Sequence, residues 1–313
     1  MLSRTADHLY WMSRYLERAV NLARMVDAHQ RLALLPRAPE AVRQGWQATL
    51  ISLGMDRAFE ERHGAVNARA AFNFVAFDRE QPGSILQCLR AARENARAVR
   101  GTITSDMWES LNATYLESLS FSADMPESAR GEFLEWVKYR AHLTRGITSG
   151  TLLRDEATQF THIGTFLERA DNTTRMLEAR WRDPGRRGER LREEASEWSV
   201  LLRAMSAYET FRRLYRDSVT PQRVTQMLLM RDDLPQGVHR CLDELQANLL
   251  AVANDQSAET LRRAGELHAQ FHFGRFEELC ADGVTAFLDR FQVRLRDLGA
   301  RIADDFLVPS GTH

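Results

Sequence analysis

The feature that most constrains this chain is a short pattern, aromatic-Leu-Glu-Arg-Ala, that occurs twice. It stands at residues 15–19 and again at 166–170, so Glu17 and Glu168 are 151 residues apart in a chain of 313. Identities continue in the same order at offsets of 151 to 153 residues: Asn21/Asn172, Arg24/Arg175, Met25/Met176, Trp46/Trp198, Leu50/Leu202, Phe59/Phe211, Pro82/Pro235 and Cys88/Cys241. Several anchors in one order predict a tandem duplication of a unit of about 150 residues.

Apolar residues around the first copy follow a helical period. They recur at spacings of three and four over residues 7–31, which predicts an amphipathic helix: Leu9, Met12, Leu16, Ala19, Ala23 and Val26. The same reasoning predicts a short apolar segment over 67–78 and helices over 39–61, 84–100, 105–120 and 126–149, the second of these capped by Ser84. Alternating β-type patterns are absent from the sequence.

We therefore predict an all-α fold, a helical bundle built from a tandem internal duplication with pseudo-two-fold symmetry. The junction between the repeats has helix-forming composition and does not resemble a flexible linker. We expect one domain over 1–306, with halves at about 1–153 and 154–306, and a frayed tail at 307–313.

Composition and charge limit the classes of partner and site that we expect. The net charge is −1, which gives no electrostatic argument for binding nucleic acid or an anionic membrane. The three cysteines lack CxxC spacing, which argues against a disulfide framework or a thiolate zinc site. No stretch approaches the ~18 consecutive apolar residues of a spanning helix, and the N-terminus lacks the apolar region of a signal peptide. We expect a cytoplasmic protein.

Polar residues form a stripe around each Glu-Arg pair. Helical spacing aligns Glu17 with Arg14, Asn21 and Arg24, and aligns Glu168 with Thr165, Asn172 and Arg175. Arg18 and Arg169 point about 100° away from the adjacent Glu, so each is expected to meet a carboxylate on another helix. Three interpretations remain open: interhelical ion pairs that fix the packing, a polar cleft that grips a carboxylate or phosphate, or a solvated stripe.

A second polar group occurs in the first half only. It comprises Arg90, Arg93, Glu94, Asn95, Arg97 and Arg100, followed by Trp108 and Asn112. At an offset of 153, only Asn95 has an identical counterpart, Asn248. One functional site on a duplicated scaffold would produce this difference, and so would drift on an exposed helix.

Motifs for metals, cofactors and catalysis are weak. Glu60 and His63 form one Glu-x-x-His motif beside a helix-ending glycine, where a carboxylate-bridged site needs two. His268 and His272 have the spacing that can share a metal, but without an HExxH pattern we interpret them as two exposed helical histidines. Phosphate loops, dinucleotide fingerprints and nucleophile elbows are absent. We expect no metal and no cofactor.

Three segments resemble a known family, the bacterial alpha-E proteins, which are all-helical and carry a Glu-Arg motif. The segments are MLSRTADHLYWMSRYLERA, SILQCLRAARENARAVRGTITSDMWESLN and THIGTFLERADNTTRMLEARW. The resemblance assigns Glu17/Arg18, Glu168/Arg169 and residues 93–97 to the family's motifs. It also implies a circularly permuted ATP-grasp ligase as partner, a transglutaminase-like protein nearby, and a role in forming peptide-type amide bonds. Two departures are Val20, where an acidic residue is expected, and Thr165 in place of the arginine found at Arg14.

These observations lead to one expectation and two alternatives. We expect an accessory or binding partner of an ATP-grasp-type ligase, with a cleft that holds an anionic substrate or docks the ligase. The expected cleft residues are Arg14, Arg18, Asn21, Arg24, Arg93, Glu94, Asn95, Arg97, Arg169, Asn172 and Arg175. One alternative is an enzyme of the same pathway that uses Glu17 or Glu168 as general base. The other is a purely structural scaffold.

Overall fold

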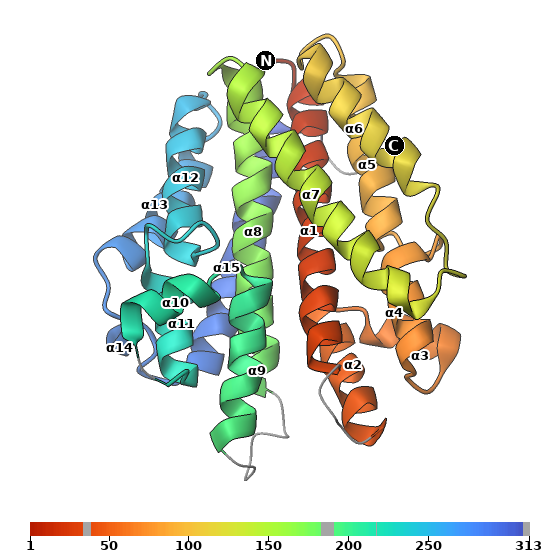
Figure 1. Cartoon of the computed structure of the whole chain (residues 1–313). Coiled ribbons are helices and arrows are strands. Elements are labelled where there is room, and N and C mark those ends of the chain that lie inside the picture. Colours follow the sequence, from red (N-terminus) through yellow and green to blue (C-terminus); the bar gives the residue numbers. More distant parts are fainter. Residues whose placement is uncertain (34–38, 183–190, 217, 309–313) are drawn as a thin grey trace.

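The computed structural model describes residues 1–33, 39–182, 191–216 and 218–308, and the regular secondary structure in these ranges is entirely helical (Figure 1). The first half contains α1 (Ser3–Ala33), α2 (Pro39–Leu53), α3 (Asp56–His63), α4 (Ala68–Phe77), α5 (Ile85–Ala98), α6 (Ser105–Ser118) and α7 (Glu127–Thr151). The second half contains α8 (Glu156–Arg182), α9 (Leu191–Ala204), α10 (Tyr208–Tyr215), α11 (Pro221–Met230), α12 (Val238–Ala251), α13 (Ala258–His272), α14 (Phe276–Leu279) and α15 (Val284–Phe306). The predicted all-α class is confirmed.

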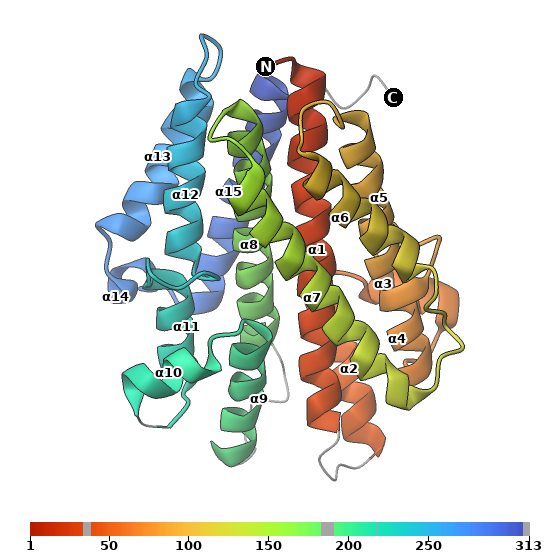
Figure 2. The same ribbon diagram turned by 45° about the horizontal axis from the view of Figure 1, so that its top comes forward.

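The long helices α1 and α8 lie side by side at the centre of the molecule (Figures 1 and 2). Helices α5 and α7 pack on α1, whereas α12 and α15 pack on α8, so the two halves flank the central pair. Because α1 is surrounded, it is buried around most of its circumference and not on a single face. Polar side chains on α1 and α8 are therefore drawn into the interior.

Helix starts follow ordinary capping chemistry. The side chains of Asn67, Ser84, Thr104 and Thr220 each accept a hydrogen bond from the backbone N–H three residues later. Such caps satisfy N–H groups that have no partner inside the helix. The Ser84 cap is the one predicted from the sequence, and it is confirmed.

The single helix predicted over 39–61 is wrong. The chain ends α2 at Leu53 and restarts at Asp56, because Gly54 adopts a φ of 66° and the N–H of Met55 donates to the carbonyl of Leu50. This is a Schellman ending, which favours glycine in the left-handed conformation. The second half ends α9 in the same way, with Ser206 at a φ of 53°.

The two halves have parallel helix patterns. Helices α3 and α10 have 8 residues each, α4 and α11 have 10 each, and α5 and α12 have 14 each. The short α14 has no counterpart among the described helices of the first half. These parallels support the duplication inferred from the sequence, which remains a prediction about origin.

Two further expectations concern the ends and the membrane. Of the tail predicted at 307–313, residues 309–313 lie outside the described residues, and Leu307 is buried. In the part of the chain that the structure describes, no helix combines the length and the apolar character needed to cross a bilayer.

Candidate functional site

The two Glu-Arg copies meet at the contact between α1 and α8. Arg169 donates to Glu17 through Nε and Nη2, at 3.0 Å and 3.2 Å. Arg18 donates to Glu168 in the same manner, at 2.6 Å and 2.9 Å. Each carboxylate therefore receives a bidentate pair from the other helix, the strongest geometry available to an arginine. The expectation that each Arg meets a carboxylate on another helix is confirmed.

Each glutamate also has a second arginine, but the two come from different places. Arg14 of α1 donates to Glu168 through Nε at 2.8 Å. The equivalent position in the second copy is Thr165, whose hydroxyl donates to a backbone carbonyl of its own helix. Glu17 instead receives a hydrogen bond from Arg145 of α7. The lack of an arginine at position 165 is thus compensated by Arg145, which comes from α7 and lies outside both copies of the motif.

Sequence reasoning missed Arg145. It carries no motif of its own, but it continues a helical stripe of α7 whose earlier members, Val137 and Ala141, are buried. The sequence signal for Arg145 is therefore a basic residue that continues an apolar stripe at helical spacing.

Close approach of the two central helices depends on Gly164. A Cβ at this position would overlap the carbonyl oxygen of Tyr10 and Oγ of Ser13 on α1. Glycine is the residue that permits such backbone contact. Because Gly164 lies one turn before Glu168, this close contact of the helices adjoins the ion pairs.

The surroundings of the two glutamates keep both ionised. Burial acts to raise the pKa of Glu17, but Arg169 and Arg145 outweigh it and lower that pKa to about 2. Burial likewise acts to raise the pKa of Glu168, and Arg14 and Arg18 outweigh it, so that pKa is also lowered. A general base working near neutral pH needs a raised pKa and a free lone pair. The geometry argues against that role for either residue.

Positive charge exceeds negative charge at this site. Two buried carboxylates, Glu17 and Glu168, are surrounded by guanidinium groups that we call the arginine cluster: Arg14, Arg18, Arg24, Arg145 and Arg169. Arg24 is buried, and its Nη1 has no hydrogen-bond partner among the described residues. Burial, together with Arg145 and Arg169, lowers the pKa of Arg24 to about 10, so it remains cationic at neutral pH.

Two amide groups beside the cluster are also unpartnered. Asn21 and Asn172 each lie one helical turn after a motif glutamate. The Nδ2 atom of each is buried, and neither donates a hydrogen bond within the described ranges. Buried donors normally find acceptors. Like Nη1 of Arg24, each is a buried donor without an acceptor in the described part of the chain.

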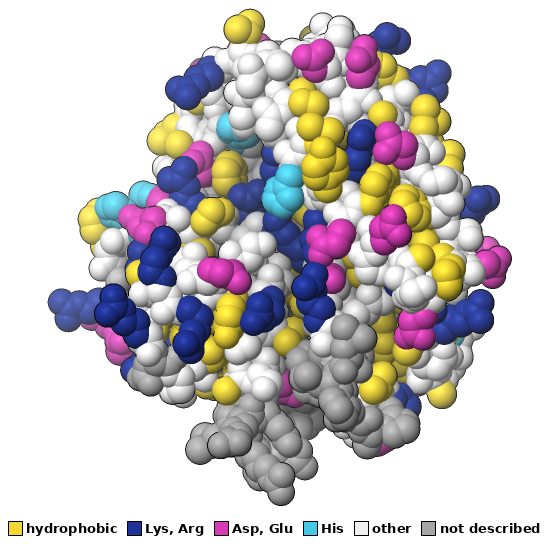
Figure 3. All heavy atoms as spheres, in the orientation of Figure 1, with side chains coloured by type: hydrophobic (Ala, Val, Ile, Leu, Met, Phe, Trp, Pro, Cys, Tyr) yellow, Lys and Arg dark blue, Asp and Glu magenta, His cyan; other side chains and the backbone are white. Residues whose placement is uncertain are grey.

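Two arginines of the cluster are partly exposed to solvent. Figure 3 shows basic side chains in a hollow in the middle of this face, where α7 and α8 lie in Figure 1. The side chains of Arg18 and Arg145 are 30% and 27% exposed. His142 of α7 is close enough for Arg24 and Arg145 to add to the effect of burial in lowering its pKa.

The paired Glu-Arg motif on a helical fold decides the family. Residues 1–307 match the family Alpha-E, described as a predicted alpha-helical domain with a conserved ER motif. This chain belongs to the Alpha-E family. An uncharacterized protein of Mycobacterium bovis and one of Mycobacterium tuberculosis are each 24% identical to it over 310 residues, covering 91% of this chain and 34% of the relative. The chain thus spans about a third of the length of these curated relatives, and no solved structure matches it.

The second polar group of this Alpha-E chain lies on α5 and α6. Arg93 donates to Asn112 through Nε at 3.0 Å and also pairs with Glu94, while Asn95 contacts His8 of α1 at 2.9 Å. Arg97 is exposed. In the described part of the chain, no hydrogen bond or ion pair joins this group to the arginine cluster. The structure therefore divides the predicted cleft residues into two separate groups.

The remaining predicted residue of this Alpha-E site, Arg175, lies at its edge. It pairs with Asp171 one turn earlier at 2.8 Å, and its side chain is 38% exposed. This pair leaves Arg175 without excess charge, so it adds little to the attraction for an anion.

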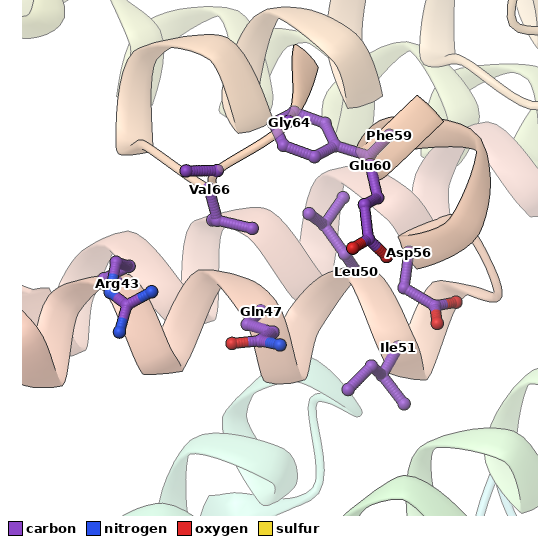
Figure 4. A pocket seen from close by; sticks show the side chains of 10 residues that line it. Arg43, Gln47, Leu50, Ile51, Asp56, Phe59, Glu60, Gly64 and Val66 are labelled. Atoms are coloured by element: carbon purple, nitrogen blue, oxygen red, sulfur yellow. The ribbon is translucent and has the colours of Figure 1, made fainter. Parts of the chain in front are cut away.

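A separate depression of about 350 Å³ lies between α2 and α3 (Figure 4). Its lining mixes apolar side chains with Gln47, Asp56 and Glu60, and Arg43 at its edge is paired with Glu40. None of its lining residues belongs to the arginine cluster. We assign the candidate site of this Alpha-E chain to the cluster, where the buried charges are.

Proposed function

We propose that this chain is a cytoplasmic binding partner of an ATP-grasp-type ligase, and that its arginine cluster holds an anionic substrate during amide-bond formation. The resemblance of the sequence supports the ligase as partner. An amide bond is made from a carboxylate and an amine, so a carboxylate is the anion that such a system must bind. The structure contributes the chemistry of the site.

The observation that carries the proposal is the state of Arg24. It is a buried cation with an unsatisfied Nη1, in a cluster whose two carboxylates already have two arginines each. An unpaired buried charge is costly, and an incoming carboxylate would supply the missing acceptor in a short, charge-assisted hydrogen bond. Arg145, which pairs with Glu17 and lies near Arg24, is partly exposed and connects this part of the cluster to solvent.

Direct anion binding provides the first test. Phosphate or a dicarboxylate, at constant ionic strength set by chloride, should raise the melting temperature of the wild type. The same additions should have a much smaller effect on Arg24→Gln. The matched control is Arg90→Gln, because Arg90 is exposed on α5 and outside the cluster. Equal stabilisation of all three proteins would contradict an anion site at Arg24.

Ligase turnover provides the second test. The chain would be purified together with the ATP-grasp-type ligase proposed as its partner, and ATP hydrolysis would be measured with a panel of amino acids. Arg24→Gln should raise the KM for the carboxylate substrate by about tenfold or more, the cost of a lost charged hydrogen bond. It should still bind the ligase, and Arg90→Gln should match the wild type. If turnover is the same with and without this chain, the proposal fails.

A structural scaffold is the second candidate. The observation that favours it is that both carboxylate oxygens of Glu17 and of Glu168 are already hydrogen-bonded. A scaffold predicts that Arg24→Gln changes neither anion binding nor turnover, whereas loss of Glu17 unfolds the protein. The two candidates therefore give opposite results in the anion-binding experiment.

A further inference from the structure

A second cluster of ionisable groups lies between α12 and α13, two helices that pack together in the second half (Figures 1 and 2). Helix α12 supplies His239 and Asp243, one turn apart, and α13 supplies His268 and His272, also one turn apart. The ligand atoms of His239, Asp243 and His272 all lie within 4.8 Å of one another. We propose that these three residues bind a divalent transition-metal cation, for which Zn²⁺ fits best.

The hydrogen bonding of His239 prepares it to act as a ligand. This side chain is buried, and its Nδ1 lies 3.0 Å from the carbonyl oxygen of Met230. A carbonyl can only accept, so Nδ1 carries the proton and the neutral ring has its lone pair on Nε2. A backbone carbonyl that orients the other ring nitrogen is the usual second contact of a metal-binding histidine.

The two atoms that face each other on α12 call for a cation. Nε2 of His239 lies 3.4 Å from Oδ1 of Asp243 and makes no hydrogen bond within the described residues, whereas Oδ1 also has Nε2 of His268 at 3.0 Å. Two lone pairs at this distance repel unless a proton or a metal cation lies between them. Donors bound to zinc at their usual lengths in a tetrahedron are about 3.3–3.4 Å apart, so this pair already has the required spacing.

The α13 histidines complete the arrangement. His272 is exposed and its ring stacks on that of His268, with centroids 5.2 Å apart. Nε2 of His268 lies 3.0 Å from Oδ1 of Asp243, so His268 positions the carboxylate. The prediction of two exposed helical histidines holds for His272 but not for the half-buried His268, which contacts Asp243. His239 is not among the residues predicted from the sequence, although its spacing of four from Asp243 is a signal that the sequence contains.

The donor set indicates the kind of metal. Two imidazoles and one carboxylate suit Zn²⁺ better than Mg²⁺ or Ca²⁺, which prefer oxygen ligands. Three protein ligands leave a fourth position, and the exposure of His272 places it next to solvent. The first half lacks these donors: at the offset of 153, Leu86 stands for His239 and Arg90 for Asp243. The metal site therefore belongs to the second half alone.

The test is metal binding by the full chain after treatment with a chelator. Calorimetric titration with Zn²⁺ should show one equivalent bound, and Co²⁺ should give the visible absorption of a tetrahedral site. His239→Ala and His272→Ala should each weaken binding at least about tenfold. His268→Ala should have a smaller effect. The matched control is His63→Ala. His63 is exposed on α3 one turn after Glu60, so this variant reports adventitious binding of metal to the surface.

Several outcomes would overturn the metal site. These are the lack of saturable binding, an affinity that survives His239→Ala and His272→Ala, or an affinity that depends on His63. His272 is exposed, so its removal leaves the core intact and decides the matter even if His239→Ala fails to fold. If His239 is instead protonated and paired with Asp243, the protein will bind no metal in these titrations. None of these readouts requires the ligase, so they are independent of the proposed function.

Discussion

Glu17 and Glu168 show how a short motif can bury charge on both sides of one contact. Each carboxylate is almost fully buried and each is held by two guanidinium groups. Such pairs contribute little net stability compared with an apolar core, but removing one partner is severe because the other charge stays buried. The motif is thus sensitive to single substitutions whatever its function.

Replacement of Glu17 by Gln tests this sensitivity. It leaves Arg169 and Arg145 without their carboxylate, and we expect the free energy of unfolding to fall by about 3–5 kcal/mol. The control is Glu94→Gln, because Glu94 is exposed on α5 and should change stability by less than about 0.5 kcal/mol. Urea denaturation followed by circular dichroism measures both. Equal stability of the two variants would show that the Glu17 pair is not structural.

The lowered pKa of Glu17 predicts an acid-sensitive stability. Its pKa falls from an ordinary value of 4.5 to about 2 in the folded state, so the unfolded chain takes up the proton first as the pH drops. The stabilisation from Glu17 is therefore complete above about pH 4.5 and is lost as the pH falls toward 2. The difference corresponds to about 3 kcal/mol. Denaturation at several pH values should show a shallower pH dependence for Glu17→Gln than for the wild type.

At the scale of single residues, the sequence predicts the direction in which a side chain points better than it predicts the residue that the side chain contacts. The 100° rotation between Glu and Arg along a helix correctly indicated that Arg18 and Arg169 reach another helix. Arg145 could not be assigned in that way, because its role depends on how α7 crosses α1. The lack of an acceptor for Arg24 is a property of the packed structure and has no trace in the sequence.

At the scale of elements, the distance between α1 and α8 controls the site. Gly164→Ala would place a Cβ against the backbone of Tyr10, and we expect a loss of about 1–3 kcal/mol from the forced separation of the helices. Gly146→Ala is the matched control, since this helical glycine has no neighbour within 4 Å of an added Cβ. It should stabilise by about 0.5–1 kcal/mol through helix propensity. Opposite shifts in melting temperature are the expected result, and a neutral Gly164→Ala would contradict the close approach.

Element boundaries were predicted unevenly. Apolar spacing located the long helices, because burial on a helix imposes its period on the sequence. The break at Gly54 was missed because a glycine inside an apolar helical pattern is equally compatible with a continuing helix. What ends α2 there is the left-handed turn that lets Met55 become buried.

At the scale of the whole molecule, the halves depend on each other. Each motif glutamate has an arginine from the other central helix. If the halves 1–153 and 154–306 were expressed separately, the glutamate and the arginine of each half would lose these partners. We expect neither fragment to unfold cooperatively, and the full chain to unfold in one transition that coincides by circular dichroism and tryptophan fluorescence. Fragments mixed in equal amounts serve as the control and should regain structure. Two separate transitions would indicate independent domains.

The reciprocal pairing across α1 and α8 also limits how such a chain can arise. A single half would carry one acceptor and one donor that cannot reach each other, whereas two identical halves satisfy both across a two-fold axis. Under the predicted duplication, the present arrangement would correspond to a homodimer whose subunits have been joined end to end. Joined copies would be free to diverge: Thr165 stands where the first copy has Arg14, and Arg145 of α7 supplies the second arginine to Glu17.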